Sequence, residues 1–199
     1  SGAISYTENI CSIPGVAGLD LNISLVYSSS ANASFRAIDD RANYAHNWRY
    51  AFPYLTNKDG QSIISGGFRY LTLANGDTYE MVSTDMGYFA PTSIYTDEIK
   101  LYEDSVHQGG AEAKYKVVYK NGNTDYFNDE GLWIKTVDKF GNKIEVTQSG
   151  TGLMKIKDTN NNVVTIQMSG NVQTITRPDN SKITINYSKK TQGVYTRCT

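Results

Sequence analysis

The chain has 199 residues, enough for one domain or two small ones with a buried core. Its formal net charge is −1, and no basic block could neutralise phosphates, so nucleic-acid binding has no electrostatic support. No apolar run approaches the roughly 20 residues of a membrane-spanning helix, so no membrane span is expected. The counts of 15 tyrosines and 17 glycines favour antiparallel β structure, because tyrosine suits half-exposed strands and glycine marks turns.

The first predicted strand follows the turn at Pro14-Gly15. Leu19, Leu21, Ile23 and Leu25 alternate with polar residues, which places the four apolar side chains on one face of a strand. The next stretch, residues 28–47, has no periodicity and is expected to be an irregular loop. Residues 48–57 then read as an aromatic strand, which Pro53 interrupts at an edge or a bend.

This aromatic segment contains the candidate ligand-binding residues. On a continuous strand, Trp48, Tyr50, Phe52 and Tyr54 would share one face. One interpretation is a platform on which sugar rings stack. The other, which we favour, is that the four side chains cover the apolar face of a neighbouring sheet.

Two segments in the middle of the chain are predicted hairpins, each pivoting on an Asn-Gly dipeptide. These are residues 71–81 around Asn75-Gly76 and residues 117–127 around Asn121-Gly122. Because Asn-Gly tolerates positive φ at both central positions, the sequence predicts two-residue type I′ turns. Between the hairpins we expect either a strand followed by a loop, or a short helical turn around Asp104–Gln108.

The second half of the chain contains an internal repeat of about 20 residues. Residues 134–146, 154–166 and 173–185 each read as an alternating strand, a polar turn and a second alternating strand. Within them Ile144 and Val146 are expected on one face, as are Ile183 and Ile185. Such a sheet has one apolar face, which another part of the chain must cover.

The sequence contains little that predicts chemistry. Asp158, Asn160 and Asn162 alternate like the start of a Ca²⁺ loop, but Val163 stands where such a loop needs glycine, and Asn and Asp are also ordinary turn residues. The two histidines, His46 and His107, form no spaced pair. Adjacent carboxylates such as Asp39-Asp40 and Glu103-Asp104 point to opposite faces of a strand, so they do not converge. We therefore predict no catalytic residue, no cofactor and no metal site, and we do not expect an enzyme.

Cys11 and Cys198 are the two cysteines, near opposite ends of the chain. Termini often lie close together, so a disulfide that closes a long loop is one alternative. Two unpaired thiols, one of them buried as a small hydrophobic side chain, are the other.

Two segments resemble the rearrangement-hotspot (RHS), or YD-repeat, proteins. Residues 127–133, Phe-Asn-Asp-Glu-Gly-Leu-Trp, resemble the repeat signature of Tyr-Asp, two variable residues, Gly, one variable residue and Leu. Residues 166–172 are a weaker copy that keeps Gly170. Residues 2–30, with Pro-Gly followed by Leu-Asp-Leu and alternating apolar residues, are similar to the segment that introduces the repeats in many bacterial members.

The resemblance implies an architecture more than a reaction. Such repeats form strands that spiral into a large β-sheet shell in secreted or cell-surface proteins, and bacterial members often enclose or display a C-terminal toxin. We therefore expect an all-β fold, an antiparallel meander of short hairpins with little or no helix. Residues 1–112 would form the introducing segment and residues 113–199 the YD-like hairpins, as one continuous sheet architecture.

The expected function is a non-catalytic structural scaffold, the N-terminal part of a larger secreted or cell-surface protein of the polymorphic-toxin type. Its partners would be the remaining repeats or the C-terminal domain of that protein. The alternative is a surface adhesin or carbohydrate-binding module that binds a cell-surface glycan through Trp48, Tyr50, Phe52 and Tyr54.

Overall fold

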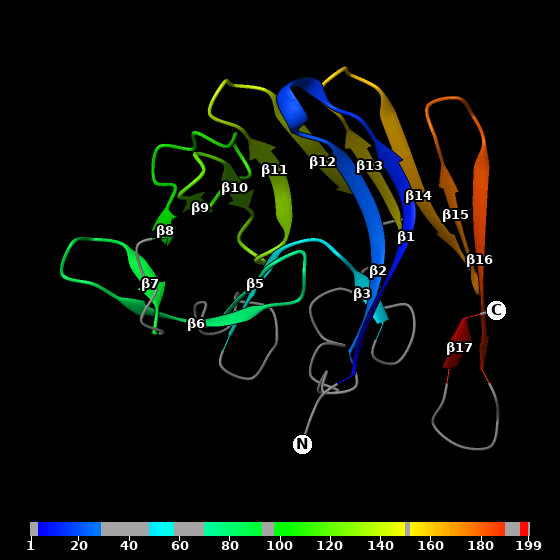
Figure 1. The fold of residues 1–199 in the computed structure, drawn as a ribbon, viewed down its shortest axis with the longest axis horizontal. Helices are drawn as coiled ribbons and strands as arrows, with labels where there is room; N and C mark the ends of the chain where they lie inside the picture. The colour runs from blue at the N-terminus through cyan, green and yellow to red at the C-terminus, as the bar shows by residue number, and fades with distance from the viewer. Residues whose placement is uncertain are drawn as a thin grey trace. The chain divides into compact units, whose positions relative to one another are not determined.

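The structure, a computed structural model, confirms the all-β prediction. It describes residues 4–28, 48–57, 70–92, 98–149, 152–189 and 196–198. Every strand pair in these ranges is antiparallel, and within each of the two sheets successive strands are neighbours, as in a meander (Figure 1). Helix in the described part consists of one short 3-10 segment, η1 (Val16–Gly18), and the single 3-10 residue Glu98, and no helix there is long and apolar enough to span a bilayer.

The chain divides into two compact units. Residues 1–50 and 145–199 form the first unit, and residues 51–144 form the second. These units are defined by contacts in space. The boundary expected at residue 112 instead separates the introducing segment from the YD-like hairpins in the sequence.

The first unit pairs a three-stranded sheet with a hairpin meander. The sheet has the order β1-β2-β3, and the meander runs from β12, most of which belongs to this unit, to β17. The strands of the first unit are β1 (Ser5–Ile13), β2 (Leu21–Ser28), β3 (Trp48–Tyr50), β12 (Lys143–Ser149), β13 (Leu153–Lys157), β14 (Val163–Ser169), β15 (Val172–Thr176), β16 (Lys182–Lys189) and β17 (Thr196–Cys198).

The alternating pattern of the sequence produces the core of this unit. Leu21, Ile23 and Leu25 of β2 are buried, while Asp20 and Asn22 are exposed, which confirms the predicted alternation. The meander contributes buried apolar side chains at alternate positions of its own strands: Val146, Met154, Ile156, Val164, Ile166, Ile175 and Ile185. Burial of these side chains is the main stabilising contribution to the unit.

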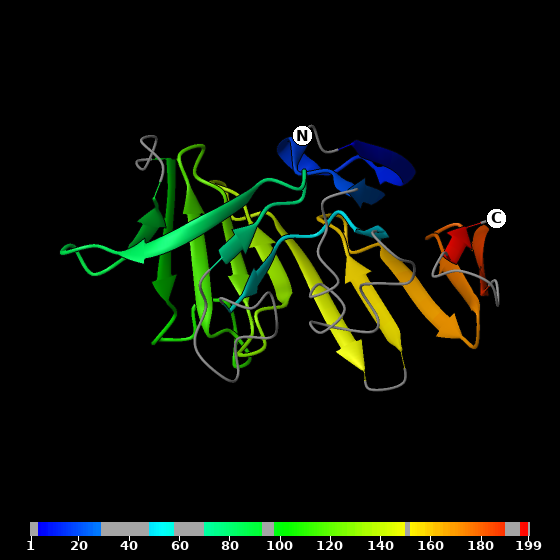
Figure 2. The ribbon, with the colours of Figure 1, turned by 90° about the horizontal axis from the view of Figure 1, so that it is seen from below.

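The β1-β2 hairpin covers one face of the meander (Figure 2). Val16 N donates to Thr159 Oγ1 at 2.8 Å, Arg177 Nη2 donates to Ile10 O at 3.3 Å, and Tyr50 Oη donates to Gln173 Oε1 at 2.6 Å. The N-terminal strands therefore provide the cover that the repeat's apolar face requires.

The second unit is a meander of short strands from β4 to β11. They are β4 (Tyr54–Thr56), β5 (Tyr70–Thr72), β6 (Thr78–Ser83), β7 (Phe89–Pro91), β8 (Ile99–Glu103), β9 (Tyr115–Tyr119), β10 (Thr124–Phe127) and β11 (Trp133–Val137). The first of these strands also contacts the loop before the last. Leu55 N donates to Gly131 O at 2.9 Å, and Tyr54 forms an isolated antiparallel bridge with Leu132.

The predicted hairpins at residues 71–81 and 117–127 are confirmed, but the predicted turn type is wrong. A type I′ turn needs positive φ at both central residues, whereas Gly76 and Gly122 have φ of 99° and 88° and neither Asn75 nor Asn121 has positive φ. Instead, Asn75 and Asn121 each accept a hydrogen bond from the amide two residues later. Each loop is a type I turn followed by one left-handed residue, which lengthens the connection.

Two further expectations concern the connections between strands. Residues 29–47, which include most of the irregular loop expected at 28–47, lie outside the described residues. The stretch before residues 117–127 ends as a strand followed by turns, since β8 finishes at Glu103 and Asp104–Gln108 form no helix.

Candidate functional site

The four aromatic residues expected to share one face of a strand do not lie on one continuous strand. Trp48 and Tyr50 belong to β3, which pairs with β2, while Tyr54 belongs to β4, which pairs with β5. Phe52 lies in the break between these strands, beside Pro53, where the sequence predicted an interruption. Tyr50 is only 3% exposed, with its ring in the core of the first unit.

Trp48 has aromatic neighbours that the sequence did not indicate. Tyr6 lies edge-on to the Trp48 indole with ring centroids 6.0 Å apart, and Tyr27 is tilted against it at 5.5 Å. These three residues, the Tyr6–Tyr27–Trp48 row, are paired in register across β1, β2 and β3. The interplanar angles of 84° and 54° make the rings pack into one another, so they do not form one flat surface.

Phe52 also packs internally, within the second unit. Its ring lies 5.2 Å from that of Trp133, which is itself buried. The contact of Phe52 with Trp133 and the burial of Tyr50 both support the interpretation that these two aromatic side chains pack in the interior.

One five-residue hairpin loop recurs in both units. In each copy the first amide donates to the fifth carbonyl, and the fourth amide donates to the first carbonyl. The fourth residue always has positive φ, between 65° and 99°, and is glycine or asparagine. The copies are residues 73–77, 84–88, 119–123, 128–132, 138–142, 158–162 and 177–181.

The copy at residues 128–132 explains the YD-like motif in physical terms. Asn128 Oδ1 accepts hydrogen bonds from the amides of Glu130 and Leu132, at 3.1 and 2.9 Å. Gly131 has φ of 86°, and a Cβ atom there would lie 2.4 Å from Leu55 O. The buried side chains of Phe127 and Trp133 anchor the two strands that flank the loop. The motif therefore specifies a hairpin and the close packing of its loop against β4.

The weaker copy at residues 166–172 folds differently. Ser169 pairs directly with Val172, which leaves a two-residue connection, and Gly170 has φ of 58° at its first position. That pattern matches a type II′ turn.

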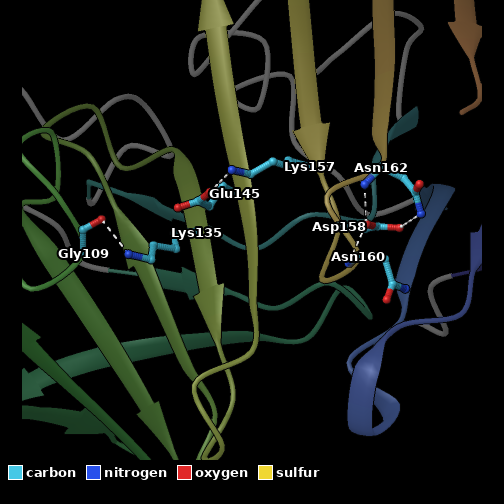
Figure 3. Close-up of polar contacts among 7 residues, drawn as sticks. All are labelled: Gly109, Lys135, Glu145, Lys157, Asp158, Asn160 and Asn162. Atoms are coloured by element: carbon cyan, nitrogen blue, oxygen red, sulfur yellow. Dashed lines mark hydrogen bonds and ion pairs between the residues drawn. The ribbon is translucent and has the colours of Figure 1, made fainter.

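Asp158, considered as a calcium ligand, is used by its own turn (Figure 3). Its Oδ1 accepts hydrogen bonds from the amides of Asn160 and Asn162, both at 2.8 Å, and its Oδ2 accepts one from Asn162 Nδ2 at 2.9 Å. Asp138 repeats this pattern with Phe140 and Asn142. Partial desolvation raises the pKa of the Asp138 carboxyl group, but the hydrogen bonds lower it by more, so this pKa lies below its ordinary value.

A buried carboxyl group in the second unit was missed by the sequence analysis. Asp125 lies in a core row with Leu101, Val117 and Thr136, and its residue is 8% exposed. Tyr119 Oη donates to Asp125 Oδ2 at 2.7 Å, and Thr136 Oγ1 donates to Oδ1. Burial raises the pKa of Asp125 to about 6, although the two hydrogen bonds act in the opposite direction.

The Asp125 cluster could have been found from strand parity. Asp125 is two residues before Phe127 in β10, so a strand that buries Phe127 also turns Asp125 inward. In the structure every oxygen of the carboxyl group has a donor from the protein. The cluster is thus organised as a buried hydrogen-bond network.

The loop between β8 and β9 packs on the opposite face of the same strands. Gly109 lies so close to the Tyr126 ring that an added Cβ would be 2.4 Å from it. Lys135 Nζ donates to Gly109 O at 3.3 Å, as Figure 3 shows, and Lys116 Nζ donates to Gln108 Oε1 at 2.6 Å. Asp104 is 1% exposed and its Oδ2 accepts a hydrogen bond from Gly109 N. Lys116 and Lys135 therefore hold the loop between β8 and β9 in place through these hydrogen bonds.

The remaining candidate groups stay apart. Glu103 is exposed and Asp104 is buried, so these adjacent carboxylates separate as the sequence predicted. His107 contacts the carbonyl of Ala113 through Nδ1 at 2.8 Å. Asp39, Asp40 and His46 lie outside the described residues. Among the residues that the structure describes, no three His, Cys, Asp or Glu side chains gather as metal ligands would.

The thiol of Cys11 is free and buried in the first unit, as one of the two cysteine alternatives predicted. The side chain of Cys198 lies outside the described side chains.

No protein-family model matches the chain, and no curated protein matches it. The resemblance to YD-repeat proteins therefore depends on the motifs in the sequence itself.

Proposed function

We propose that the chain is a non-catalytic structural module, the N-terminal part of a larger secreted or cell-surface protein of the RHS/YD-repeat type. In such a protein it would begin a β-sheet scaffold that later repeats extend. Its partners would be those repeats or a C-terminal domain.

The observation that supports this proposal best is how the loop side chains are used. Asn128, Asp138 and Asp158 stand at the first position of their loops, and each accepts two backbone hydrogen bonds there. These polar residues, which could have bound a ligand or a metal, satisfy donors that the turn leaves open. A sequence that uses its polar side chains in this way is suited to reversing the chain at regular intervals.

The alternative is a carbohydrate-binding module, for which one specific observation exists. Tyr6 is 53% exposed beside the half-buried Trp48, so part of an aromatic cluster is accessible within the described residues. Aromatic rings at protein surfaces commonly bind the apolar faces of sugars. The tilted ring packing of the Tyr6–Tyr27–Trp48 row favours a structural role over this one.

A glycan array separates the two proposals. The scaffold proposal expects no reproducible glycan binding by the intact chain. Binding that disappears in both Trp48→Ala and Tyr6→Ala, while circular dichroism shows both variants folded, would overturn it. Phe140→Ala is the matched control, because Phe140 is 69% exposed in the loop at residues 138–142, outside the aromatic cluster.

A further inference from the structure

Two sheet edges of the first unit, those formed by β1 and by β16, differ in how they are protected. A strand at the edge of a sheet has unpaired backbone groups, and soluble proteins usually block them with bulges, charges or covering segments. The edge formed by β1 has such features. Its pairing with β2 shifts register between Asn9 and Cys11, and Arg177 Nη2 donates to the carbonyl of Ile10 inside this bulge.

The edge formed by β16 has no bulge along half of its length, and Lys182 is the one charged residue of that part. Residues Lys182–Asn186 pair with β15 in unbroken register, without a bulge. On the other side of β16, β17 pairs only with Tyr187, Ser188 and Lys189. Within the described ranges, no strand pairs with that side of Lys182–Asn186.

This open segment is also amphipathic. Ile183 and Ile185 face the core, opposite the fully buried Ile175 and Gln173 of β15. Burial decreases toward the edge, since Ile175 is 0% exposed whereas Ile183 is half-buried. A further strand here would complete both the backbone ladder and the apolar row.

The pairing of β17 indicates which strand this is. Cys198 lies opposite Tyr187, and each step forward along β17 is a step back along β16. Continued in this register, the first residue beyond Thr199 falls opposite Ile185, and the third falls opposite Ile183. Directly opposed residues of an antiparallel pair point to the same face.

We infer that the edge at Lys182–Asn186, which has no partner strand among the described residues, is the docking site for the strand that would follow Thr199 in the larger protein proposed above. That segment is an extension of β17, with apolar side chains at its first and third positions and polar ones between them. The inference rests on the proposed function, because it assigns to the edge the next strand of the same scaffold. Such a strand would continue the β16–β17 pairing that is already present.

The test compares three chains of otherwise identical sequence. The first is the 199-residue chain, the second carries Ile-Thr-Val-Lys after Thr199, and the third carries Thr-Ile-Lys-Val. The two added peptides have the same composition, but only the first places apolar residues opposite Ile185 and Ile183. It is expected to raise Tm by about 2–8 °C, since two cross-strand apolar pairs and new ladder hydrogen bonds form.

Hydrogen exchange of the same chains gives a local readout. Amides of Lys182–Asn186 that do not pair with β15 should exchange at least about tenfold more slowly in the second chain, and unchanged in the third. Equal behaviour of the two extended chains would overturn the inference. So would sedimentation showing that the unextended chain forms a dimer that Thr184→Pro abolishes, because the occupant would then be a second copy.

These readouts are independent of the glycan array. Glycan binding lost in Trp48→Ala removes the proposed function but leaves the edge measurement valid, whereas a failed register test removes only the docking assignment.

Discussion

Comparing Gly131→Ala with Gly141→Ala tests whether the loop at residues 128–132 needs glycine in order to pack closely against β4. The two glycines occupy the same position of the same five-residue loop, with φ of 86° and 88°. Their surroundings differ. A Cβ at position 131 would lie 2.4 Å from Leu55 O, whereas one at position 141 would meet nothing within 4 Å.

The magnitudes follow from these two environments. Alanine at positive φ costs about 1–2 kcal/mol, and this penalty applies to both variants. Gly131→Ala must also displace the Leu55 carbonyl, at a cost typical of overpacking of about 1–3 kcal/mol. It disturbs the 2.9 Å hydrogen bond from Leu55 N to Gly131 O as well, worth about 1 kcal/mol. Gly131→Ala should therefore lower the free energy of unfolding by about 2–4 kcal/mol more than Gly141→Ala.

Urea unfolding followed by tryptophan fluorescence measures this difference. The chain has two tryptophans, and Trp133 directly follows the loop at residues 128–132, so a Trp48→Phe background makes the signal report on the second unit. Equal destabilisation by the two substitutions would show that Gly131 is needed only for its φ and not for its close approach to Leu55. A larger effect of Gly141→Ala would contradict this close approach as well.

Three other predictions concern the polar residues that fold the chain. Burial raises the pKa of Asp125 from 3.8 to about 6, so the folded state binds a proton more tightly than the unfolded state. The stability that this proton contributes is greatest below pH 4 and falls by about 3 kcal/mol as the pH rises to 6. Urea unfolding should show this decrease in the wild type and not in Asp125→Asn. Asp158→Ala removes three hydrogen bonds within its turn and should cost about 1–3 kcal/mol, whereas Asp158→Asn, which keeps an acceptor at Oδ1, should retain most of the stability in thermal unfolding. Tyr50→Phe deletes the 2.6 Å hydrogen bond to Gln173 and should lower stability by about 1–2 kcal/mol; an unchanged Tm would show that this contact does not hold the N-terminal cover in place.

The parts of the fold that depend on local pattern could be predicted from the sequence. Side chains on a strand alternate faces whatever the strand pairs with, so the burial of Leu21, Ile23 and Leu25 followed from their spacing. The need for a cover over the repeats followed from the same pattern. Hairpin positions were also readable, because glycine and asparagine mark reversals.

The parts that depend on pairing between distant strands could not be predicted. Asn-Gly suits both a two-residue turn and the left-handed end of a longer loop, and strand register decides between them. The stripe from Trp48 to Tyr54 assumed a continuous strand, but β3 and β4 pair with different neighbours. The contact of Tyr6 with Trp48 joins residues far apart in sequence, so neither composition nor spacing revealed it.

Sequencing the natural gene beyond the codon for Thr199 tests directly whether this chain begins a repeated β scaffold. The scaffold proposal predicts further five-residue loops with Gly or Asn at the fourth position, recurring about every 20 residues as they do at residues 138–142, 158–162 and 177–181. An open reading frame that stops within a few codons, or passes straight into a domain without this repeat, would contradict the claim that the chain begins a repeated β scaffold.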